Sequence, residues 1–239
     1  MKPLIVIPAR LAAVRLPNKP LANIHNQPMI MHVYNRARTL GLPVIVAAGD
    51  PEIVDVIHYN GGQAILTDPA LPSGTDRVWA ATQIFDPQGD YDCIVNLQGD
   101  LPTINPSSIQ VAVDLLAQSD FDITTVAAPV VDPHDLTTPN VVKAVISHKH
   151  QGLYFSRNTI PFGDGVVYHH IGLYAFRRAA LQRFVSLPPS PLEQRERLEQ
   201  LRALEDGMRI GVGIVHDIPV SVDHLEDLEK ARALLRPQQ

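Results

Sequence analysis

The chain has 239 residues, of which 45% are hydrophobic and 19% are charged, as in an ordinary globular protein. Its formal net charge of −5 argues against a general nucleic-acid-binding protein. The single cysteine, Cys93, excludes a disulfide framework and a cysteine-rich metal site, and it suits a reducing cytoplasm. No apolar run reaches the roughly 18 residues of a membrane span, and no signal peptide is visible, so we expect no membrane association.

The first half of the chain alternates apolar strands with amphipathic helices. Strands are predicted at residues 4–7, 44–47, 64–66 and 93–97, and helices at 28–40, 50–61, 73–84 and 105–117. Asp50 before Pro51 is typical of a helix N-cap. Because strand and helix alternate, the sequence predicts an α/β fold with a doubly wound, mostly parallel sheet.

The rhythm changes in the second half. Strands predicted at 124–131, 141–147, 152–155 and 168–176 have little helix between them, which indicates an antiparallel insertion subdomain, roughly residues 124–190, within a single domain spanning 1–239. A capping box at Ser190-Pro191-Leu192-Glu193 predicts one helix that continues to about Gly207. A strand at 210–215 and a helix that opens at 223–226 follow.

The loop after the first strand is cationic. It carries Arg10, Arg15 and Lys19, and no acidic residue precedes Asp50. A positive loop at the carboxyl end of a buried strand, in an acidic chain, is where a polyphosphate would bind. The alternative is a solvated basic surface.

Two carboxylates are candidate ligands of a divalent cation. Asp100 directly follows the strand 93–97, where hard oxygen ligands hold Mg²⁺ against a triphosphate. It could instead be a turn aspartate between Gly99 and Pro102. Asp223 is a possible second ligand, although its position three residues before Glu226 also fits a helix cap.

Other polar residues carry weaker signals. Ser73 and Gly74 at a helix start suit close approach to a base or ribose, or simply cap the helix. His169-His170 at a strand start could hydrogen-bond in a substrate pocket or fill the core. The glycine fingerprints of dinucleotide and P-loop sites are missing, as are the zinc-hydrolase and serine-hydrolase motifs.

Short blocks spread along the chain carry a resemblance to a known family. They are Ile7-Pro8-Ala9-Arg10, Arg15-Leu16-Pro17-Asn18-Lys19-Pro20-Leu21, Pro28-Met29-Ile30, Ser73-Gly74-Thr75-Asp76-Arg77-Val78, Val95-Asn96-Leu97-Gln98-Gly99-Asp100, Pro139-Asn140-Val141-Val142-Lys143, Tyr154-Phe155-Ser156-Arg157, Ile160-Pro161, His170-Ile171-Gly172-Leu173-Tyr174, Leu198-Glu199-Gln200-Leu201-Arg202, Val222-Asp223 and Glu226-Asp227-Leu228. On these blocks the chain resembles the 3-deoxy-manno-octulosonate (Kdo) cytidylyltransferases, also called CMP-Kdo synthetases. The His-Ile-Gly and Leu-Glu-Gln-Leu-Arg blocks are the most specific to the Kdo enzymes.

The resemblance implies an enzyme with a Rossmann-like nucleotidyltransferase fold. Such an enzyme joins CTP and Kdo, with Mg²⁺, to give CMP-Kdo and pyrophosphate for lipopolysaccharide synthesis in the cytoplasm, and it is typically a homodimer. Arg10, Lys19 and Asp100 would be catalytic, and Asp100 and Asp223 would bind the metal. The residues implied in substrate binding are Pro8, Ala9, Arg15, Ser73, Gly74, Arg77, Gln98, Arg157, His170, Glu199 and Gln200.

The sequence departs from the family pattern at Ala13-Val14, Leu101 and His224, and the stretch 162–168 is short. These departures leave the sugar acid open, so a cytidylyltransferase for 8-amino-Kdo or a sialic acid is an alternative. A metal-dependent glycosyltransferase and a non-catalytic nucleotide-binding module are more distant alternatives.

Overall fold

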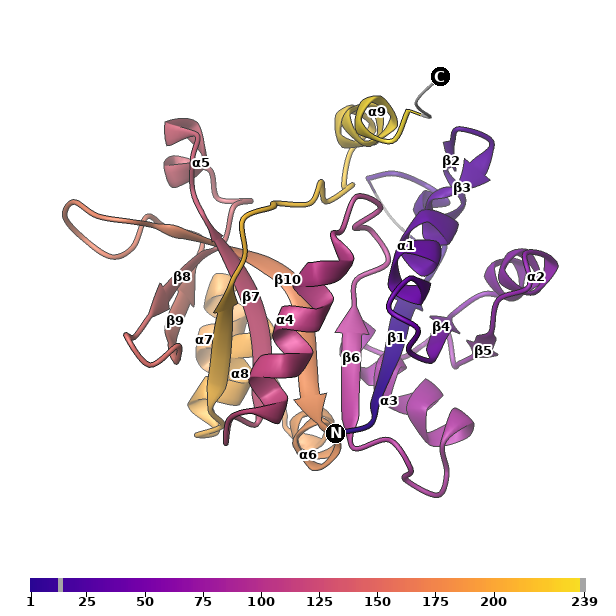
Figure 1. Ribbon diagram of the computed structural model, residues 1–239, viewed down its shortest axis with the longest axis horizontal. Helices are drawn as coiled ribbons and strands as arrows, with labels where there is room; N and C mark the ends of the chain where they lie inside the picture. Colours follow the sequence, from indigo (N-terminus) through magenta and orange to yellow (C-terminus); the bar gives the residue numbers. More distant parts are fainter. Residues whose placement is uncertain (13–14, 237–239) are drawn as a thin grey trace. The chain divides into compact units, whose positions relative to one another are not determined.

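The computed structural model describes residues 1–12 and 15–236 (Figure 1). Ala13 and Val14 lie outside the described residues. The chain divides into two compact units: the parallel unit, residues 2–106 and 219 onward, and the inserted unit, residues 107–218. In the part of the chain that is described, no helix has the length and apolar character needed to cross a membrane.

The parallel unit contains four parallel strands in the order β6-β1-β4-β5. Every residue of β4 and β6 is buried, as expected for parallel strands covered on both faces. The strands are β1 (Pro3–Ala9), β4 (Val44–Ala48), β5 (Ala64–Leu66) and β6 (Cys93–Leu97). All four confirm the predicted runs.

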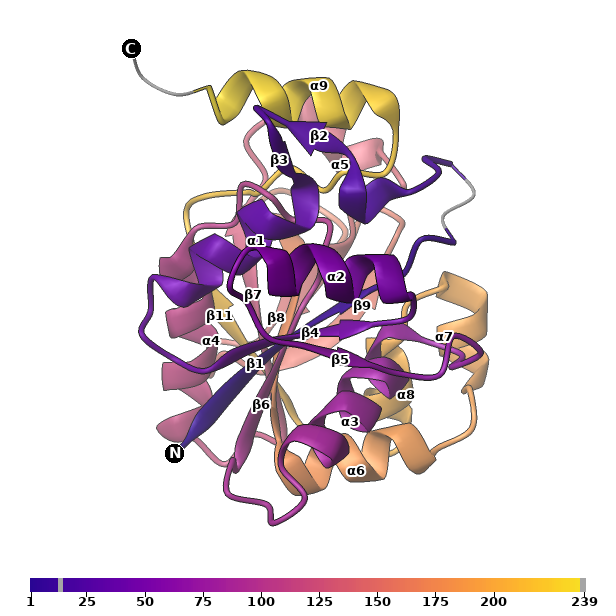
Figure 2. The same cartoon turned by 90° about the vertical axis from the view of Figure 1, so that its right-hand side faces the viewer.

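Three helices connect these strands and cover both faces of the sheet. They are α1 (Met29–Arg38), α2 (Pro51–Tyr59) and α3 (Gly74–Phe85). Right-handed crossovers place α1 and α2 on one face and α3 on the other, and in Figure 2 α2 lies above β4 and β5 while α3 lies below them. The sheet is therefore doubly wound, as predicted.

The chain reverses its direction across the sheet between β1 and β6. It moves outward from β1 to β4 and β5, and then returns to the other side of β1 as β6. Pro8 fits near the end of β1 because the ladder with β6 ends at Val6↔Asn96, so its missing N–H costs no strand bond. In doubly wound sheets, ligands bind beside the carboxyl ends of the strands at such a switch point.

Both ends of the sequence complete the parallel unit. A small core cluster of Ile24, Met29, Val222, Leu228 and Ala231 joins the segment after β1 to the final helix. The cluster draws on β2 (Asn23–Ile24), the start of α1 and α9 (Leu225–Leu234), while the 3-10 helix η1 (Lys19–Leu21) and β3 (Gln27–Pro28) lie between β1 and α1 in the chain. This packing fixes both the loop that carries Lys19 and the turn that carries Asp223.

The inserted unit has a mixed sheet. Its β7 pairs in parallel with β11 and antiparallel with β10, and the hairpin β8–β9 extends from β10. The strands are β7 (Ile123–Pro129), β8 (Lys143–Ile146), β9 (Gly152–Ser156), β10 (Tyr168–Arg177) and β11 (Ile210–Ile214). The helices are α4 (Pro106–Ala117), α5 (Pro133–Thr137), α6 (Arg178–Ser186), α7 (Pro191–Glu196) and α8 (Gln200–Glu205).

One helix prediction in this unit was wrong, and α5 and α6 were not foreseen. The capping box at Ser190 starts α7 as predicted, but the helix does not continue to Gly207. Arg197 adopts the left-handed conformation, with φ of 56°, and ends α7; α8 then begins at Gln200. Leu198, Leu201 and Leu204 have the spacing of one helical face, but all three follow Arg197, so hydrophobic periodicity alone could not reveal the break.

Candidate functional site

A cleft with a volume of about 450 Å³ opens at the carboxyl ends of β1 and β6, at the switch point of the parallel unit. Three parts of the sequence form it: the segment after β1, the start of α3 and the turn after β6, joined by Asp223. Its lining residues include Pro8, Ala9, Arg10, Arg15, Lys19, Ser73, Gly74, Arg77, Gln98, Gly99, Asp100 and Asp223. The structure therefore brings together every predicted site residue that lies in this unit.

Gly99 allows the turn after β6 to pass close to β1. A Cβ atom at this position would lie 2.8 Å from the carbonyl oxygen of Pro8 and 3.1 Å from Cδ1 of Ile30. The first of these neighbours is backbone and cannot move aside, so only glycine fits. This contact brings Asp100 to the edge of the cleft next to the residues that follow β1.

Lys19 connects the two predicted metal ligands. Its ammonium nitrogen lies 2.9 Å from Oδ2 of Asp100 and 3.2 Å from Oδ1 of Asp223. Arg15 adds a longer ion pair to Asp223, at 3.6 Å. Burial alone would lower the pKa of Lys19, but the two carboxylates outweigh it and raise the pKa above its usual value.

Asp223 reaches the cleft because the chain before it binds the turn after β6. The N–H of Val222 donates to the carbonyl of Asp100 at 2.9 Å, and that of Val220 donates to the Thr103 hydroxyl at 2.8 Å. The cap of α9 is His224, whose N–H donates to the Asp227 carboxylate. The helix-cap interpretation of Asp223 was thus wrong, and its carboxylate contacts Lys19 instead.

The two carboxylates fit the Mg²⁺ that the resemblance implies. Their oxygens converge on one cationic nitrogen, and hard carboxylate oxygens are the ligands that Mg²⁺ prefers. Mg²⁺ commonly takes one or two carboxylates from a protein and the rest of its ligands from phosphates and water. Among residues 1–12 and 15–236 there is no cluster of three or more His, Cys, Asp or Glu side chains suited to a metal.

The cations around the cleft differ in their environment. Arg10 and Arg15 are exposed, whereas Arg77 is buried. The guanidinium of Arg77 donates to the Thr67 hydroxyl at 2.6 Å and to the carbonyls of Asp68 and Pro69 at 3.0 and 3.4 Å. Burial and then the nearby Arg10 lower the pKa of Arg77. Arg77 therefore holds the loop before α3 in place at the cleft.

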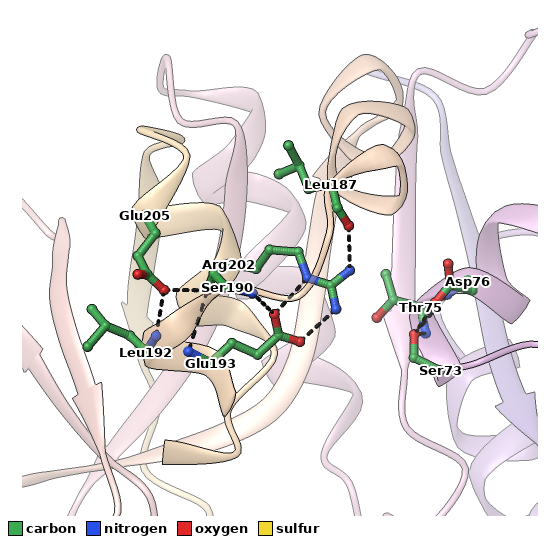
Figure 3. Close-up of polar contacts among 9 residues, drawn as sticks. All are labelled: Ser73, Thr75, Asp76, Leu187, Ser190, Leu192, Glu193, Arg202 and Glu205. Carbon is green, nitrogen blue, oxygen red and sulfur yellow. Dashed lines mark hydrogen bonds and ion pairs between the residues drawn. The ribbon is translucent and has the colours of Figure 1, made fainter. Parts of the chain in front are cut away.

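The start of α3 is a capped helix, as one of the two sequence interpretations expected. The Ser73 hydroxyl accepts from the N–H groups of Thr75 and Asp76 and donates to the Asp76 carboxylate at 2.6 Å (Figure 3). Both Ser73 and Gly74 line the cleft, so the cap does not conflict with ligand binding. Their contact with a nucleoside stays a prediction.

Gln98 is oriented by a buried polar relay. Its side-chain amide nitrogen donates to Oδ1 of Asn96 at 3.2 Å, and the amide nitrogen of the buried Asn96 donates to the Thr75 hydroxyl at 3.2 Å. The amide oxygen of Gln98 is thereby left as the group that can accept a bond from a ligand. Sequence reasoning did not find Asn96, although a polar residue in an otherwise apolar strand is a usable signal.

The remaining predicted residues lie in the inserted unit. Arg157 donates to three backbone carbonyls, those of Pro139, Glu196 and Arg197, at 3.0, 2.8 and 3.2 Å. His170 is buried, and its Nε2 lies 2.9 Å from the Thr125 hydroxyl. Burial, and to a smaller degree His169, lower the pKa of His170 to about 3, so its ring is neutral.

Glu199 and Gln200 stand at the start of α8. Glu199 is the N-cap residue, and Gln200 is the first helical residue and is buried. Among the described residues, the side-chain nitrogen of Gln200 is buried and has no hydrogen-bond partner. Gln200 is therefore not part of a solvated helix face.

Sequence reasoning also missed one carboxylate beside the cleft. Asp50 occupies the N-cap position of α2 as predicted, but its side chain makes no cap hydrogen bond. Its Oδ2 instead accepts from the N–H of Leu11 at 2.7 Å. The available signal is that Asp50 follows a buried strand, as Asp100 does.

Comparison with known proteins agrees with the predicted resemblance. The cytidylyltransferase family model matches residues 4–210. A 3-deoxy-manno-octulosonate cytidylyltransferase from Rhodospirillum centenum is 56% identical, with 99% of this chain and 94% of the relative covered. One from Paramagnetospirillum magneticum is 52% identical, with 99% and 98% covered.

Solved structures agree with these relatives. The structure of CMP:2-keto-3-deoxy-manno-octonic acid synthetase complexed with CTP matches with a TM-score of 0.91 and 37% identity, covering 98% of both chains. A cytidylyltransferase from Leptospira borgpetersenii, 16% identical with a TM-score of 0.62 and coverage of 98% and 86%, shares the fold. The chain belongs to the cytidylyltransferases and, within them, to the 3-deoxy-manno-octulosonate cytidylyltransferase family.

Proposed function

We propose that this chain transfers CMP from CTP to the anomeric hydroxyl of Kdo and releases pyrophosphate. The observation that carries the proposal is one cleft lined by Arg10, Arg15, Lys19, Asp100 and Asp223, in which Lys19 binds both carboxylates. The curated relatives are named for this reaction, and a structure 37% identical to this chain is complexed with CTP.

In this proposal the cations bind the triphosphate. Arg10 and Arg15 are exposed at the cleft and can reach phosphate oxygens. Lys19 has three N–H donors, two of which face Asp100 and Asp223, so the third can donate to a phosphate. As pyrophosphate leaves, these fixed positive charges stabilise the charge that develops on it.

Asp100 and Asp223 would hold Mg²⁺. When bound, the ion would supply Lewis-acid polarisation of the phosphate oxygens. The anomeric hydroxyl attacks the α-phosphorus in line with the leaving pyrophosphate, so the contribution of the protein is to align the two substrates and neutralise charge.

We place the nucleoside at the start of α3. Gly74 leaves room there, since a Cβ at this position would make only ordinary contacts with Pro8, the nearest at 3.5 Å. Pro8 and Ala9 line the cleft next to Gly74, and Arg77 fixes the loop that precedes Ser73. Gln98 can accept a hydrogen bond from either substrate through its amide oxygen.

We assign Arg157, His170, Glu199 and Gln200 to the sugar acid. The support is the resemblance, together with the buried amide nitrogen of Gln200, which has no protein partner among the described residues. An unsatisfied buried donor costs about 1–3 kcal/mol, so a sugar oxygen that accepts from it would gain affinity. The resemblance also implies a homodimer, which light scattering of the purified protein tests.

The decisive experiment is a pyrophosphate-release screen. ATP, GTP, CTP and UTP are each paired with Kdo, 8-amino-Kdo and a sialic acid, with Mg²⁺ and with EDTA. We expect release only with CTP and fastest release with Kdo, and none with EDTA. Faster release with another sugar acid would reassign the substrate. No release with any pair would contradict the proposal and favour a glycosyltransferase or a binding module.

A further inference from the structure

The carboxylate of Asp50 binds the chain that leaves β1 rather than the helix it precedes. It stands in the N-cap position of α2 without a side-chain cap bond, and its Oδ2 accepts from the N–H of Leu11 at 2.7 Å. The two residues are 39 positions apart in the sequence. A carboxylate that accepts from a backbone N–H makes one of the stronger hydrogen bonds in proteins.

This bond continues the pairing of β1 and β4 beyond the ends of the strands. The ladder ends at Ala9↔Ala48, and the N–H of Gly49 then donates to the carbonyl of Ala9 at 2.9 Å. The bond from Leu11 to Asp50 is the next connection. Arg10 lies between these two bonds, so the backbone on both sides of it is fixed.

Gly49 brings this corner close to the cleft. A Cβ atom on Gly49 would lie 2.9 Å from Nη1 of Arg77 and 3.3 Å from Cβ of Arg10. The Asp50 carboxylate also raises the pKa of Arg77, against the stronger effects of burial and Arg10. Asp50 thus acts electrostatically on Arg77 and binds the backbone of Leu11, the residue after Arg10. Asp50 itself is not among the residues that line the cleft.

We propose that Asp50 is a positioning residue for the triphosphate: through the N–H of Leu11 it fixes the backbone that carries Arg10 at the cleft. The proposal rests on the proposed function and goes beyond it, because Asp50 does not line the cleft and would act through Leu11 and Arg10. Its predicted signature is a defect in the use of CTP that does not extend to the sugar acid.

The test compares Asp50→Ala with Asp50→Asn. The amide oxygen of asparagine can accept from Leu11, whereas alanine cannot. We expect Asp50→Ala to raise the KM for CTP about tenfold, as for loss of a charge-assisted hydrogen bond, and to leave the KM for Kdo within about twofold. Asp50→Asn should restore the KM for CTP to within about threefold of wild type.

Asp86→Ala is the matched control. Its carboxylate accepts from the N–H groups of Asp90 and Tyr91, at 2.9 and 3.0 Å, in the loop between α3 and β6. The Asp86→Ala variant therefore removes hydrogen bonds of the same kind, from backbone N–H groups to a carboxylate, at a place away from the cleft. We expect this variant to lower stability and to leave both KM values within about twofold of wild type.

Amide hydrogen exchange at Leu11, measured by NMR on the free protein, gives a readout independent of catalysis. Exchange should accelerate about tenfold or more in Asp50→Ala and stay near wild type in Asp50→Asn and Asp86→Ala. The proposal would be overturned if Asp50→Ala kept the wild-type KM for CTP. It would also be overturned if Asp50→Ala and Asp86→Ala raised the KM for CTP by the same factor. If the wild type releases no pyrophosphate, the proposed function fails, and unchanged exchange at Leu11 would overturn the positioning role separately.

Discussion

The cleft of the parallel unit and the α7–α8 junction of the inserted unit both concentrate charge, but they neutralise it differently. In the cleft, one ammonium is shared by Asp100 and Asp223, whose side chains are 26% and 42% exposed. At the junction, Arg202 donates to both carboxylate oxygens of Glu193, at 2.8 and 2.6 Å, and the two side chains are only 8% and 13% exposed (Figure 3).

The two arrangements suit different tasks. Ion pairs that water can reach contribute about 0–1 kcal/mol each, so a ligand can replace their partners at little cost. Loss of one partner of a buried, bidentate pair costs about 3–5 kcal/mol, because a charge is left without compensation. Substitutions in the cleft should therefore impair activity, and substitutions at the junction should impair stability.

The strongest test of this contrast is Asp100→Asn. We expect turnover to fall about a thousandfold or more, since the variant removes one of the two carboxylates that would hold Mg²⁺. The free energy of unfolding should change by no more than about 1 kcal/mol, because Lys19 keeps its contact with Asp223. Pyrophosphate release and urea unfolding measure the two effects. Near-normal Mg²⁺-dependent release in this variant would contradict the metal assignment.

Lys19→Ala should have the next largest effect. The variant removes a fixed cation from the leaving pyrophosphate and leaves Asp100 and Asp223 facing one another. We expect kcat/KM for CTP to fall a few hundredfold, or about 3–4 kcal/mol of transition-state stabilisation. Steady-state kinetics of purified protein, with Lys230→Ala as an exposed-lysine control, provide the measurement. A loss no greater than that of the control would show that Lys19 is not part of the machinery.

Glu193→Gln tests the other side of the contrast. Burial would raise the pKa of Glu193, but hydrogen bonds from Arg202 and from the Ser190 N–H lower it, so the carboxylate is ionised at neutral pH. Its replacement leaves Arg202 buried without a counter-charge. We expect the free energy of unfolding, measured in urea, to fall by about 3 kcal/mol, the low end of the range for a buried pair, because the amide oxygen of glutamine can still accept from Arg202. The double variant Glu193→Gln/Arg202→Met should recover part of this loss, and no recovery would argue against the ion pair as the cause.

The most gradual predicted effect concerns the buried His170, because it builds up over several pH units. The folded protein keeps this ring neutral down to about pH 3, whereas an unfolded chain protonates it near pH 6.5. The unfolded state therefore binds more protons between these values, and the free energy of unfolding should fall by about 1.4 kcal/mol per unit as the pH is lowered. His170→Gln, which can still bond the Thr125 hydroxyl, should flatten this dependence in urea titrations. Parallel curves for the two proteins would show that His170 does not remain neutral.

The sequence predicted those site residues whose positions depend on patterns within one segment, and not those whose positions depend on contacts between distant segments. The runs of β1 and β6 and the polar residues that end them are local patterns, so Arg10, Lys19 and Asp100 could be placed in advance. The side chain of Asp223 could not be placed in advance. A helix cap pairs residues three positions apart, and both Asp223 with Glu226 and His224 with Asp227 have this spacing. The bond from Val222 to Asp100, made across the fold, decides between them.

Two other features could not be predicted from the sequence either. Arg197 in the left-handed conformation ends α7 directly before Leu198, Leu201 and Leu204, and no glycine marks this break in the sequence. The N-cap pattern at Asp50 is satisfied in the sequence, yet tertiary contact with Leu11 takes the carboxylate elsewhere. Local rules identify which residues are available, and contacts between distant segments decide how they are used.

The contact between Lys19 and Asp223 joins residues 204 positions apart, and the entire inserted unit is translated between them. During synthesis at the ribosome, β1, β4, β5 and β6 can assemble early, while one carboxylate of the cleft and the helix that covers Met29 are still to be made. A nascent chain therefore acquires its sheet long before it acquires a complete catalytic centre. The cleft can be completed only after Asp223 and α9 have been synthesised.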